Sequence, residues 1–337
     1  GGGIAGLMLA QQLIEKSTQV HVSVYCSDPE VGLRGSSNRQ GAVYPLLQSR
    51  QSPLAMFYAE AYRFAIDYYQ RTLPSNTVVS HGWSGLLQQA INPDMNEKFK
   101  IIAQLWPDIV AVKDAKKSSK LAGIKTPMMS LYFKDALWLD PQQLCLWLKD
   151  SLLSSGQCKL YLNHKITNIF DIHKEADATV VAAGIDSVDV GLPMLTNLEG
   201  VQGQVSTVNA DSNLALTELK TILCHKGYVT PSNGQIQSFG ATFEKQSKYS
   251  DITPEPTHQA TQQNITQIKQ QYPGQPWAQQ LQINHVVGNN AAVRATTPDH
   301  LPMAGKLFTR QWLETVLDKN NGKFKRLSKL NAVTTET

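Results

Sequence analysis

Three glycines at the start of the chain have a spacing that could hold phosphate groups. Gly1, Gly3 and Gly6 satisfy the pattern GxGxxG, and residues 4–16 carry apolar side chains at helical spacing. Such glycines allow a tight turn, a close approach of a pyrophosphate and close helix–strand packing at a helix N-terminus. Residues 20–26 alternate like a strand, so we expect the chain to begin in the turn of a βαβ unit. The pattern therefore favours dinucleotide binding.

The acidic residue that usually contacts the ribose in such a unit should close the strand 20–26. Cys26 stands at this place, and Asp28 follows two residues later. This departure argues against an ordinary NAD site. The sequence leaves open whether Asp28 contacts a ribose or caps a turn.

The polar loop 36–41 reads Ser-Ser-Asn-Arg-Gln-Gly. Its hydroxyl, amide and guanidinium groups could donate hydrogen bonds to a phosphate dianion or to a flavin. A solvated turn before a strand explains the same composition equally well.

Arg294 lies within a strand-like segment of small and apolar residues, 285–296. A buried arginine is costly unless an anion pairs with it, so a carboxylate or a phosphate is a plausible partner. A structural salt bridge is an equally good interpretation.

The elements that must position these residues follow from periodicity and capping. Asp140 and Pro141 have the types preferred at the N-cap and first position of a helix, which should end near Leu153. Other helices are expected over 53–73, 94–106 and 257–272 and in the tail from 311, with a basic loop over 113–120. Strands are expected over 77–88 (broken at 81–82), 131–139, 159–169, 179–184, 201–208, 221–230, 236–243 and 285–296, and the strand 179–184 should be buried.

Composition excludes several classes of protein. The 337 residues are 42% hydrophobic, which is too apolar for a disordered chain, and the net charge of +4 permits a polyanionic partner without requiring one. No apolar stretch approaches the roughly 18 residues of a membrane span. The four cysteines lack metal-ligand spacing, so we expect no metal site, reduced thiols and a cytoplasmic protein: Cys26, Cys145, Cys158 and Cys224.

Four segments, taken together, resemble the D-amino-acid-oxidase-like flavoproteins, the relatives of glycine oxidase and sarcosine oxidase. These segments are 1–6, 35–47, 179–184 and 294–305. The resemblance implies an α/β (mixed α+β) fold, with a Rossmann-like FAD-binding domain and an interleaved antiparallel-sheet substrate domain. The FAD-binding domain would comprise 1–52, 136–200 and 284–337, and the substrate domain would comprise 53–135 and 201–283.

Five further segments look like one branch of this family, the oxidoreductase halves of bifunctional enzymes that modify the tRNA wobble uridine. They are 38–41, 138–145, 203–206, 227–231 and 239–242, and the resemblance covers roughly residues 1–306. It implies FAD-dependent removal of the carboxymethyl group from 5-carboxymethylaminomethyl-(2-thio)uridine, which gives 5-aminomethyl-(2-thio)uridine and glyoxylate. The implied partners are tRNA and an N-terminal S-adenosylmethionine-dependent methyltransferase half, which nothing in this chain resembles.

The resemblance also assigns roles to individual residues. Arg294 would clamp the substrate carboxylate, Tyr228 would hydrogen-bond to the substrate or line the pocket, and Gln204 is a further pocket residue. Ile166 would offer its backbone to the adenine. The other implied cofactor-binding residues are Gly1, Gly3, Gly6, Cys26, Ser37, Asn38, Arg39, Gln40, Gly41, Gly184 and Gly305. Because no cysteine follows Cys224, we expect FAD to be held non-covalently.

Two other functions stay open. A free amino-acid or amine oxidase of the glycine/sarcosine oxidase type would use Arg294 and Tyr228 in the same way. A non-catalytic flavin-fold module that binds tRNA or a partner would explain why the family's late Gly-Ser-Arg-Gly turn is not found after Gly305. A tRNA enzyme needs a basic surface, for which the candidates are Lys113, Lys116, Lys117, Lys120 and Lys125.

Overall fold

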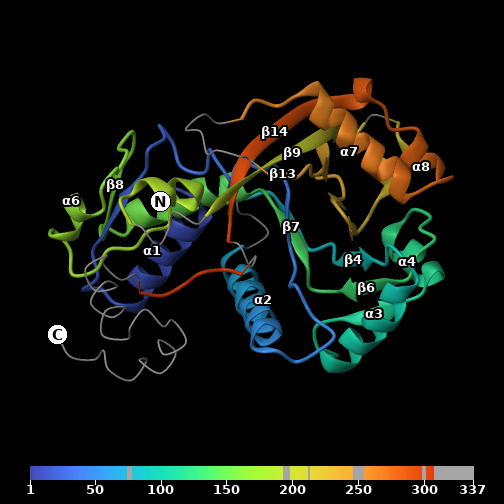
Figure 1. The fold of residues 1–337 in the computed structure, drawn as a ribbon, viewed down its shortest axis with the longest axis horizontal. Helices are drawn as coiled ribbons and strands as arrows, with labels where there is room; N and C mark the ends of the chain where they lie inside the picture. Colours follow the sequence, from blue (N-terminus) through green and yellow to red (C-terminus); the bar gives the residue numbers. More distant parts are fainter. Residues whose placement is uncertain (74–77, 193–197, 212, 246–253, 298–300, 307–337) are drawn as a thin grey trace, which may run out of the picture.

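The computed structural model describes residues 1–73, 78–192, 198–211, 213–245, 254–297 and 301–306. One part, on the left in Figure 1, contains helices α1 (Ile4–Lys16) and α5 (Pro141–Ser154) and strands β1 (Val22–Tyr25) and β8 (Cys158–Tyr161). The other part contains a large sheet and most of the remaining helices. The helix expected from residue 311 lies outside the described residues. The mixed α/β fold class is confirmed.

The first part has the helix and the following strand that the glycine pattern predicts. Strand β1 pairs in parallel with β8, and α1 packs against α5 with Leu7 and Ala10 buried. The N-cap of α5 is Asp140, whose Oδ1 accepts a hydrogen bond from the Gln143 backbone N–H at 2.9 Å. The predicted start of this helix is therefore confirmed.

The expected buried strand 179–184 is wrong. These residues are irregular up to Gly184, and the Val180 side chain is 60% exposed. Gly1 lies between this segment and β1, because its amino group donates to the Tyr25 carbonyl at 2.6 Å and its Cα faces the Ala182 carbonyl. No described strand pairs with 179–184, although Val181 still packs against the small apolar cluster of Ile169, Val190 and Leu192.

The second part is built on a sheet of nine described strands. Its path is β13 (Glu244–Lys245), β9 (Glu199–Asn209), β12 (Ile236–Gly240), β11 (Tyr228–Val229), β10 (Ile222–Cys224), β4 (Leu86–Gln89), β6 (Ser130–Phe133) and β5 (Ala111–Lys113), and β14 (Val286–Thr296) also pairs with β9. Only the β10–β4 pair is parallel. A smaller sheet joins β2 (Gly41–Val43), β7 (Leu137–Leu139) and β3 (His81–Gly82). The predicted strand 131–139 is thus two strands in different sheets.

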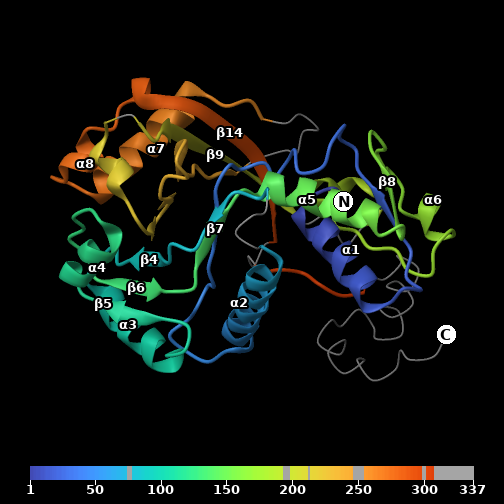
Figure 2. The ribbon, with the colours of Figure 1, turned by 180° about the vertical axis from the view of Figure 1, so that it is seen from behind.

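Strands β9 and β14 run beside each other from the side of α7 (His258–Gln271) to the boundary with the first part (Figures 1 and 2). The segment 284–337 was expected in the FAD-binding domain, whereas β14 within it extends the large sheet. The division into two discontinuous domains stays a prediction.

The helices α2 (Pro53–Thr72), α3 (Asp94–Leu105) and α7 lie close to their predicted ranges. Short helices α6 (Phe170–His173) and α8 (Pro276–Gln279) were not predicted. The basic loop predicted over 113–120 is wrong, because α4 (Ala115–Ala122) occupies it. Asp114 caps this helix by accepting from the Lys117 N–H at 2.8 Å, and Ser118 and Ala122 are buried on its inner face.

Among the described residues, no helix is long and apolar enough to cross a membrane.

Candidate flavin and substrate site

The three glycines of the opening turn meet different surroundings. A Cβ added to Gly6 would overlap the Gly1 carbonyl oxygen, and one added to Gly1 would lie 2.6 Å from the Ala182 oxygen. A Cβ on Gly3 would meet only the Ser36 hydroxyl, at 3.4 Å. Gly1 and Gly6 thus permit close packing within the protein, whereas Gly3 faces open space that a ligand could approach.

Ser36 occupies the N-terminus of α1. Gly3 has no side chain with which to cap this helix, and the Ser36 hydroxyl accepts a hydrogen bond from the Ile4 backbone N–H at 3.1 Å. The unsatisfied N–H groups of the first turn and the helix dipole favour an anion at this place. Ser36 was not among the predicted site residues, although it stands inside the polar loop that the sequence singles out.

The loop after Ser36 is tied to strand β14 by Asn290. The Asn290 amide nitrogen lies 3.0 Å from both the Ser37 hydroxyl and the Asn38 side-chain oxygen. Ser37 also donates to the Arg34 carbonyl at 2.6 Å. The sequence analysis did not predict Asn290 as a site residue. The one sequence feature that could have indicated it is its position four residues before Arg294, which places both side chains on the same face of the strand.

Gln40 and Arg39 differ in their surroundings. The buried Gln40 side chain donates to the Pro231 carbonyl at 2.9 Å and accepts from the Thr230 hydroxyl and the Ser238 N–H. This amide therefore joins the loop to the β11–β12 connection, and its predicted contact with the cofactor stays a prediction. Arg39 is exposed and forms no ion pair with the described residues, so its guanidinium is available to an anion. Gly41, with which β2 begins, follows directly.

Cys26 and Asp28 follow the end of β1, where an acidic residue usually contacts the ribose. The Cys26 side chain is buried against Gly2, at which a Cβ would overlap its sulfur. Asp28 neither caps a turn nor stays free, because Arg34 binds its carboxylate through Nε and Nη2 at 2.9–3.0 Å. Arg34 also lies 3.5 Å from Asp186.

Three predicted cofactor residues leave their backbone open. The backbone of Ile166 makes no hydrogen bond with the described residues. Gly184, at φ +58°, begins the 3-10 helix 184–189, and a Cβ on it would meet nothing within 4 Å. A Cβ on Gly305, at φ +156°, would likewise meet nothing within 4 Å. These features, with the open side of Gly3 and the donors at α1, fit a bound dinucleotide.

Arg294 lies on one face of the β9–β14 pair and has no carboxylate partner among the described residues. Its guanidinium carbon lies 4.7 Å from the centre of the Phe243 ring. Gly203 leaves it room, because a Cβ there would lie 2.7 Å from Arg294 Nη2. Burial lowers the pKa of Arg294, and the nearby Tyr228 acts in the opposite direction. A half-buried cation without a described anion is suited to receive one from a ligand.

Tyr228 lies near Arg294 and is hydrogen-bonded to the loop 36–41. Its hydroxyl donates to the Gln40 carbonyl oxygen at 3.1 Å. Burial raises its pKa to about 12, and Arg294 partly offsets this effect. Tyr228 is therefore a neutral phenol near neutral pH. The neighbouring Tyr44 hydroxyl lies 3.1 Å from the Cys224 sulfur, a contact that the sequence does not suggest.

Gln204 lies on the other face of β9 and is not brought together with Arg294. Directly opposite residues of antiparallel strands point to the same side, and Arg294 opposes Val201 whereas Gln204 opposes Ala291. The Gln204 amide is buried and bonds to the Thr257 backbone, the Thr261 hydroxyl and Asn289. The structure therefore does not bring Gln204 together with Arg294; its amide joins the sheet to α7, and its predicted role in the substrate pocket stays a prediction.

Comparison with known proteins bears on this site. A family model described as FAD dependent oxidoreductase matches residues 1–319. The chain is 30% identical over 329 residues to a tRNA 5-methylaminomethyl-2-thiouridine biosynthesis bifunctional protein of Shewanella putrefaciens, with 90% of this chain and 46% of the relative covered. The relative of the same description from Pseudoalteromonas translucida is 30% identical over 333 residues, with 93% and 47% covered. The chain thus spans about half the length of these relatives.

Among solved structures, the glycine oxidase of Geobacillus kaustophilus is similar in fold. Its TM-score is 0.70 and its sequence identity 17%, with 91% of this chain and 84% of that chain covered. At this identity the likeness concerns the fold alone.

Proposed function

Because the chain belongs to the FAD-dependent oxidoreductase family, we propose that it removes the carboxymethyl group from 5-carboxymethylaminomethyl-(2-thio)uridine at the wobble position of tRNA. The bifunctional relatives are tRNA 5-methylaminomethyl-2-thiouridine biosynthesis proteins, which supports a substrate on the same pathway of uridine modification. The observation that carries the proposal is Arg294, a half-buried guanidinium without a described carboxylate partner, beside the loop that leads from the glycine turn. The substrate side chain ends in the carboxylate that such a cation would bind.

FAD is the cofactor of this family, and the glycine turn, Ser36, Arg39, Ile166 and Gly184 would hold it non-covalently. When bound, FAD supplies the acceptor for a hydride from the substrate carbon between nitrogen and carboxylate. The substrate is left as an imine, which water hydrolyses to the amine and glyoxylate.

The chain's own residues act by positioning. Arg294 would bind the two carboxylate oxygens through its planar fork, which fixes the orientation of the adjacent carbon. Tyr228, as a neutral phenol held by the Gln40 carbonyl, would line the pocket without adding charge. The substrate carbon can release a hydride only while the neighbouring amine is neutral. A protein carboxylate close by would favour the protonated amine, and none of the described carboxylates pairs with Arg294.

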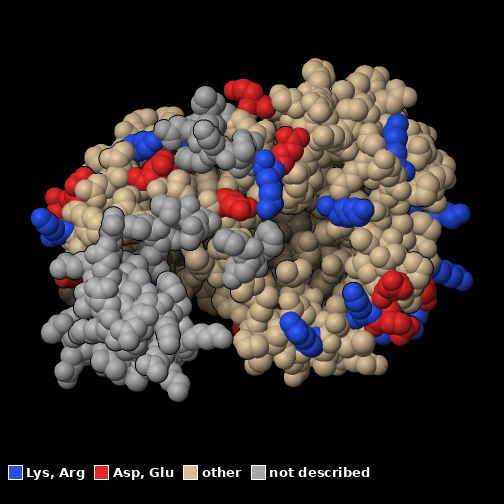
Figure 3. Space-filling view, in the orientation of Figure 1, with Lys and Arg blue, Asp and Glu red and all other residues tan. Residues whose placement is uncertain are grey.

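A basic surface supports tRNA as the macromolecule. Lys116, Lys120 and Lys125 are exposed and form no ion pairs with described residues, whereas Lys117 lies 3.9 Å from Asp114 and Lys113 lies over the Tyr132 ring. Figure 3 shows several Lys and Arg side chains over the right part of this face, where Figure 1 places α3, α4, α7 and α8. The centre of the same face is hollowed (Figure 3).

Two further points belong to the proposal. The relatives are bifunctional. We propose that their other half methylates the amine product of this chain's reaction, with S-adenosylmethionine as the methyl donor. A cytoplasmic location follows from a tRNA substrate.

The decisive experiment uses the FAD-reconstituted chain without oxygen. Adding tRNA that carries 5-carboxymethylaminomethyluridine should remove the visible flavin absorbance and release glyoxylate in equal amount. The same tRNA carrying 5-aminomethyluridine is the matched control and should do neither. Bleaching by free glycine or sarcosine but not by tRNA would instead identify a free amine oxidase. Failure to take up FAD would identify a non-catalytic module.

A further inference from the structure

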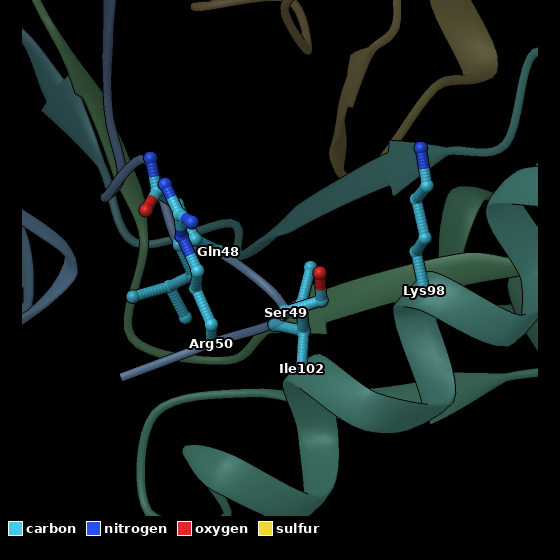
Figure 4. A pocket seen from close by; sticks show the side chains of 6 residues that line it. Gln48, Ser49, Arg50, Lys98 and Ile102 are labelled. Carbon is cyan, nitrogen blue, oxygen red and sulfur yellow. The ribbon is translucent and has the colours of Figure 1, made fainter. Parts of the chain in front are cut away.

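A basic pocket lies apart from the residues assigned to the flavin and the substrate. It is formed by the segment leading from β2 to α2 and by helix α3, and its volume is about 320 Å³. Its lining residues are Leu47, Gln48, Ser49, Arg50, Lys98 and Ile102. In Figure 4 the Arg50 and Lys98 side chains rise from opposite walls and extend in the same direction.

The pocket presents hydrogen-bond donors above an apolar base. Leu47 and Ile102 are buried, whereas Ser49, Arg50 and Lys98 are exposed. The Ser52 hydroxyl, which caps α2, donates to the Gln48 side-chain oxygen at 2.8 Å. This bond occupies the acceptor end of Gln48 and leaves its NH₂ group as the donor that faces a ligand.

The two cations of the pocket differ from their neighbours in having no anion. On α2, Arg63 pairs with Asp108 and Glu60, and Arg71 with Asp67. On α3, Lys100 pairs with Glu97 at 2.6 Å. Arg50 and Lys98 form no ion pair with any described residue. Among the described cations of α2, α3 and the segment between β2 and α2, the two without an ion pair are therefore the two that share one pocket.

We propose that this pocket binds a backbone phosphate of the RNA substrate at a distance from the oxidised uridine, an inference that rests on the proposed function. A phosphodiester offers two unesterified oxygens, which a guanidinium binds as a fork and an ammonium as a point charge. The Gln48 and Ser49 donors add neutral hydrogen bonds to phosphate or ribose oxygens. The pocket is open to solvent on one side, as a site on a continuous strand must be.

The test is tRNA binding, measured by fluorescence anisotropy with a labelled transcript and the FAD-loaded chain. The variant Arg50→Ala/Lys98→Ala should weaken binding about tenfold at moderate salt and reduce the slope of log K against log salt by about 2. Arg71→Ala/Lys100→Ala removes the same charge from the neighbouring ion pairs and should change the dissociation constant less than twofold. Equal effects of the two variants, or no effect of the first, would overturn the pocket as a phosphate site.

A second variant guards against indirect effects. Arg50→Gln/Lys98→Gln keeps polar side chains at both positions, and it should weaken binding as the alanine variant does if charge is what matters. The wild-type chain separates this inference from the proposed function. Wild-type binding of tRNA without oxidation of its modified uridine would refute the function and leave the pocket standing. If the wild type oxidises the modified tRNA and the Arg50→Ala/Lys98→Ala variant binds that tRNA equally well, the pocket is refuted and the function stands.

Discussion

Gly203 makes room for Arg294: a Cβ on Gly203 would lie 2.7 Å from the Arg294 Nη2 atom and 2.9 Å from the Thr242 carbonyl oxygen. The two residues stand on adjacent strands, two positions apart in register, and on the same face. Because the Thr242 contact is with a backbone oxygen, movement of the Arg294 side chain alone does not relieve the overlap of an added methyl group. The guanidinium is thus placed by the absence of a neighbouring side chain.

The variant Gly203→Ala should therefore displace Arg294 and raise the KM for the carboxymethyl substrate at least tenfold, while FAD stays bound. A double-mutant cycle checks the cause: in an Arg294→Ala background, Gly203→Ala should have almost no further effect on turnover. Steady-state kinetics and the flavin spectrum measure both quantities. Additive losses in the cycle would contradict the explanation.

Arg294→Lys tests the fork geometry. Lysine keeps the positive charge but offers a point donor, so the bidentate contact with a carboxylate is lost. We expect kcat/KM to fall about 100-fold, which corresponds to about 3 kcal/mol. The rate of flavin reduction by the substrate under anaerobic conditions measures it. An unchanged rate in this variant would show that the carboxylate is bound elsewhere.

The glycines of the opening turn should separate cofactor binding from folding. Gly3→Ala places a methyl group on the open side of the turn and should cost the apoprotein at most about 1 kcal/mol, but lower FAD affinity at least tenfold. Gly6→Ala overlaps the Gly1 carbonyl and should lower the free energy of unfolding by about 2 kcal/mol or more. FAD titration and urea unfolding of the apoprotein measure the two effects. Equal loss of stability in both variants would argue against this division.

Gln204→Ala should affect stability and leave the chemistry intact. Removing the amide leaves the buried Thr261 hydroxyl and the Thr257 backbone groups without this partner, at a cost of about 2–4 kcal/mol. We expect kcat per FAD-loaded molecule to stay within twofold. The exposed Gln262→Ala is the control and should change the free energy of unfolding by less than about 0.5 kcal/mol. A large loss of kcat without loss of stability would restore Gln204 to the substrate pocket.

The lowered pKa of His225 should make the free energy of unfolding decrease in acid. Burial lowers its pKa from 6.5 to about 4, and its Nδ1 accepts from the Lys226 N–H at 2.7 Å. Between these two values the unfolded chain binds more protons than the folded one. Stability is therefore retained above pH 6.5 and falls as the pH drops toward 4, by up to about 3 kcal/mol.

His225→Asn retains an acceptor and cannot titrate. Its free energy of unfolding should therefore depend less on pH between 4 and 6.5 than that of the wild type, when both are measured by urea unfolding. The exposed His258→Asn serves as control and should follow the wild type. A wild-type dependence in His225→Asn would assign the acid sensitivity to other groups.

The sequence by itself determined the elements whose signals are local. The glycine turn and α1, the helix that Asp140 and Pro141 begin, and the position of Arg294 in a strand of small residues all rest on neighbours within a few positions. Capping, period and glycine conformation act over that range, so they can be read along the chain.

The tertiary structure decided what depends on pairing between distant segments. Whether Gln204 faces the pocket or α7 is set by its register with Ala291, 87 positions along the chain, and a shift of one residue would reverse it. Asn290 and Ser36 enter the site only through contacts with the loop 37–38 and the start of α1. The segment 179–184 has strand composition, but a strand needs a partner, and no described strand provides one.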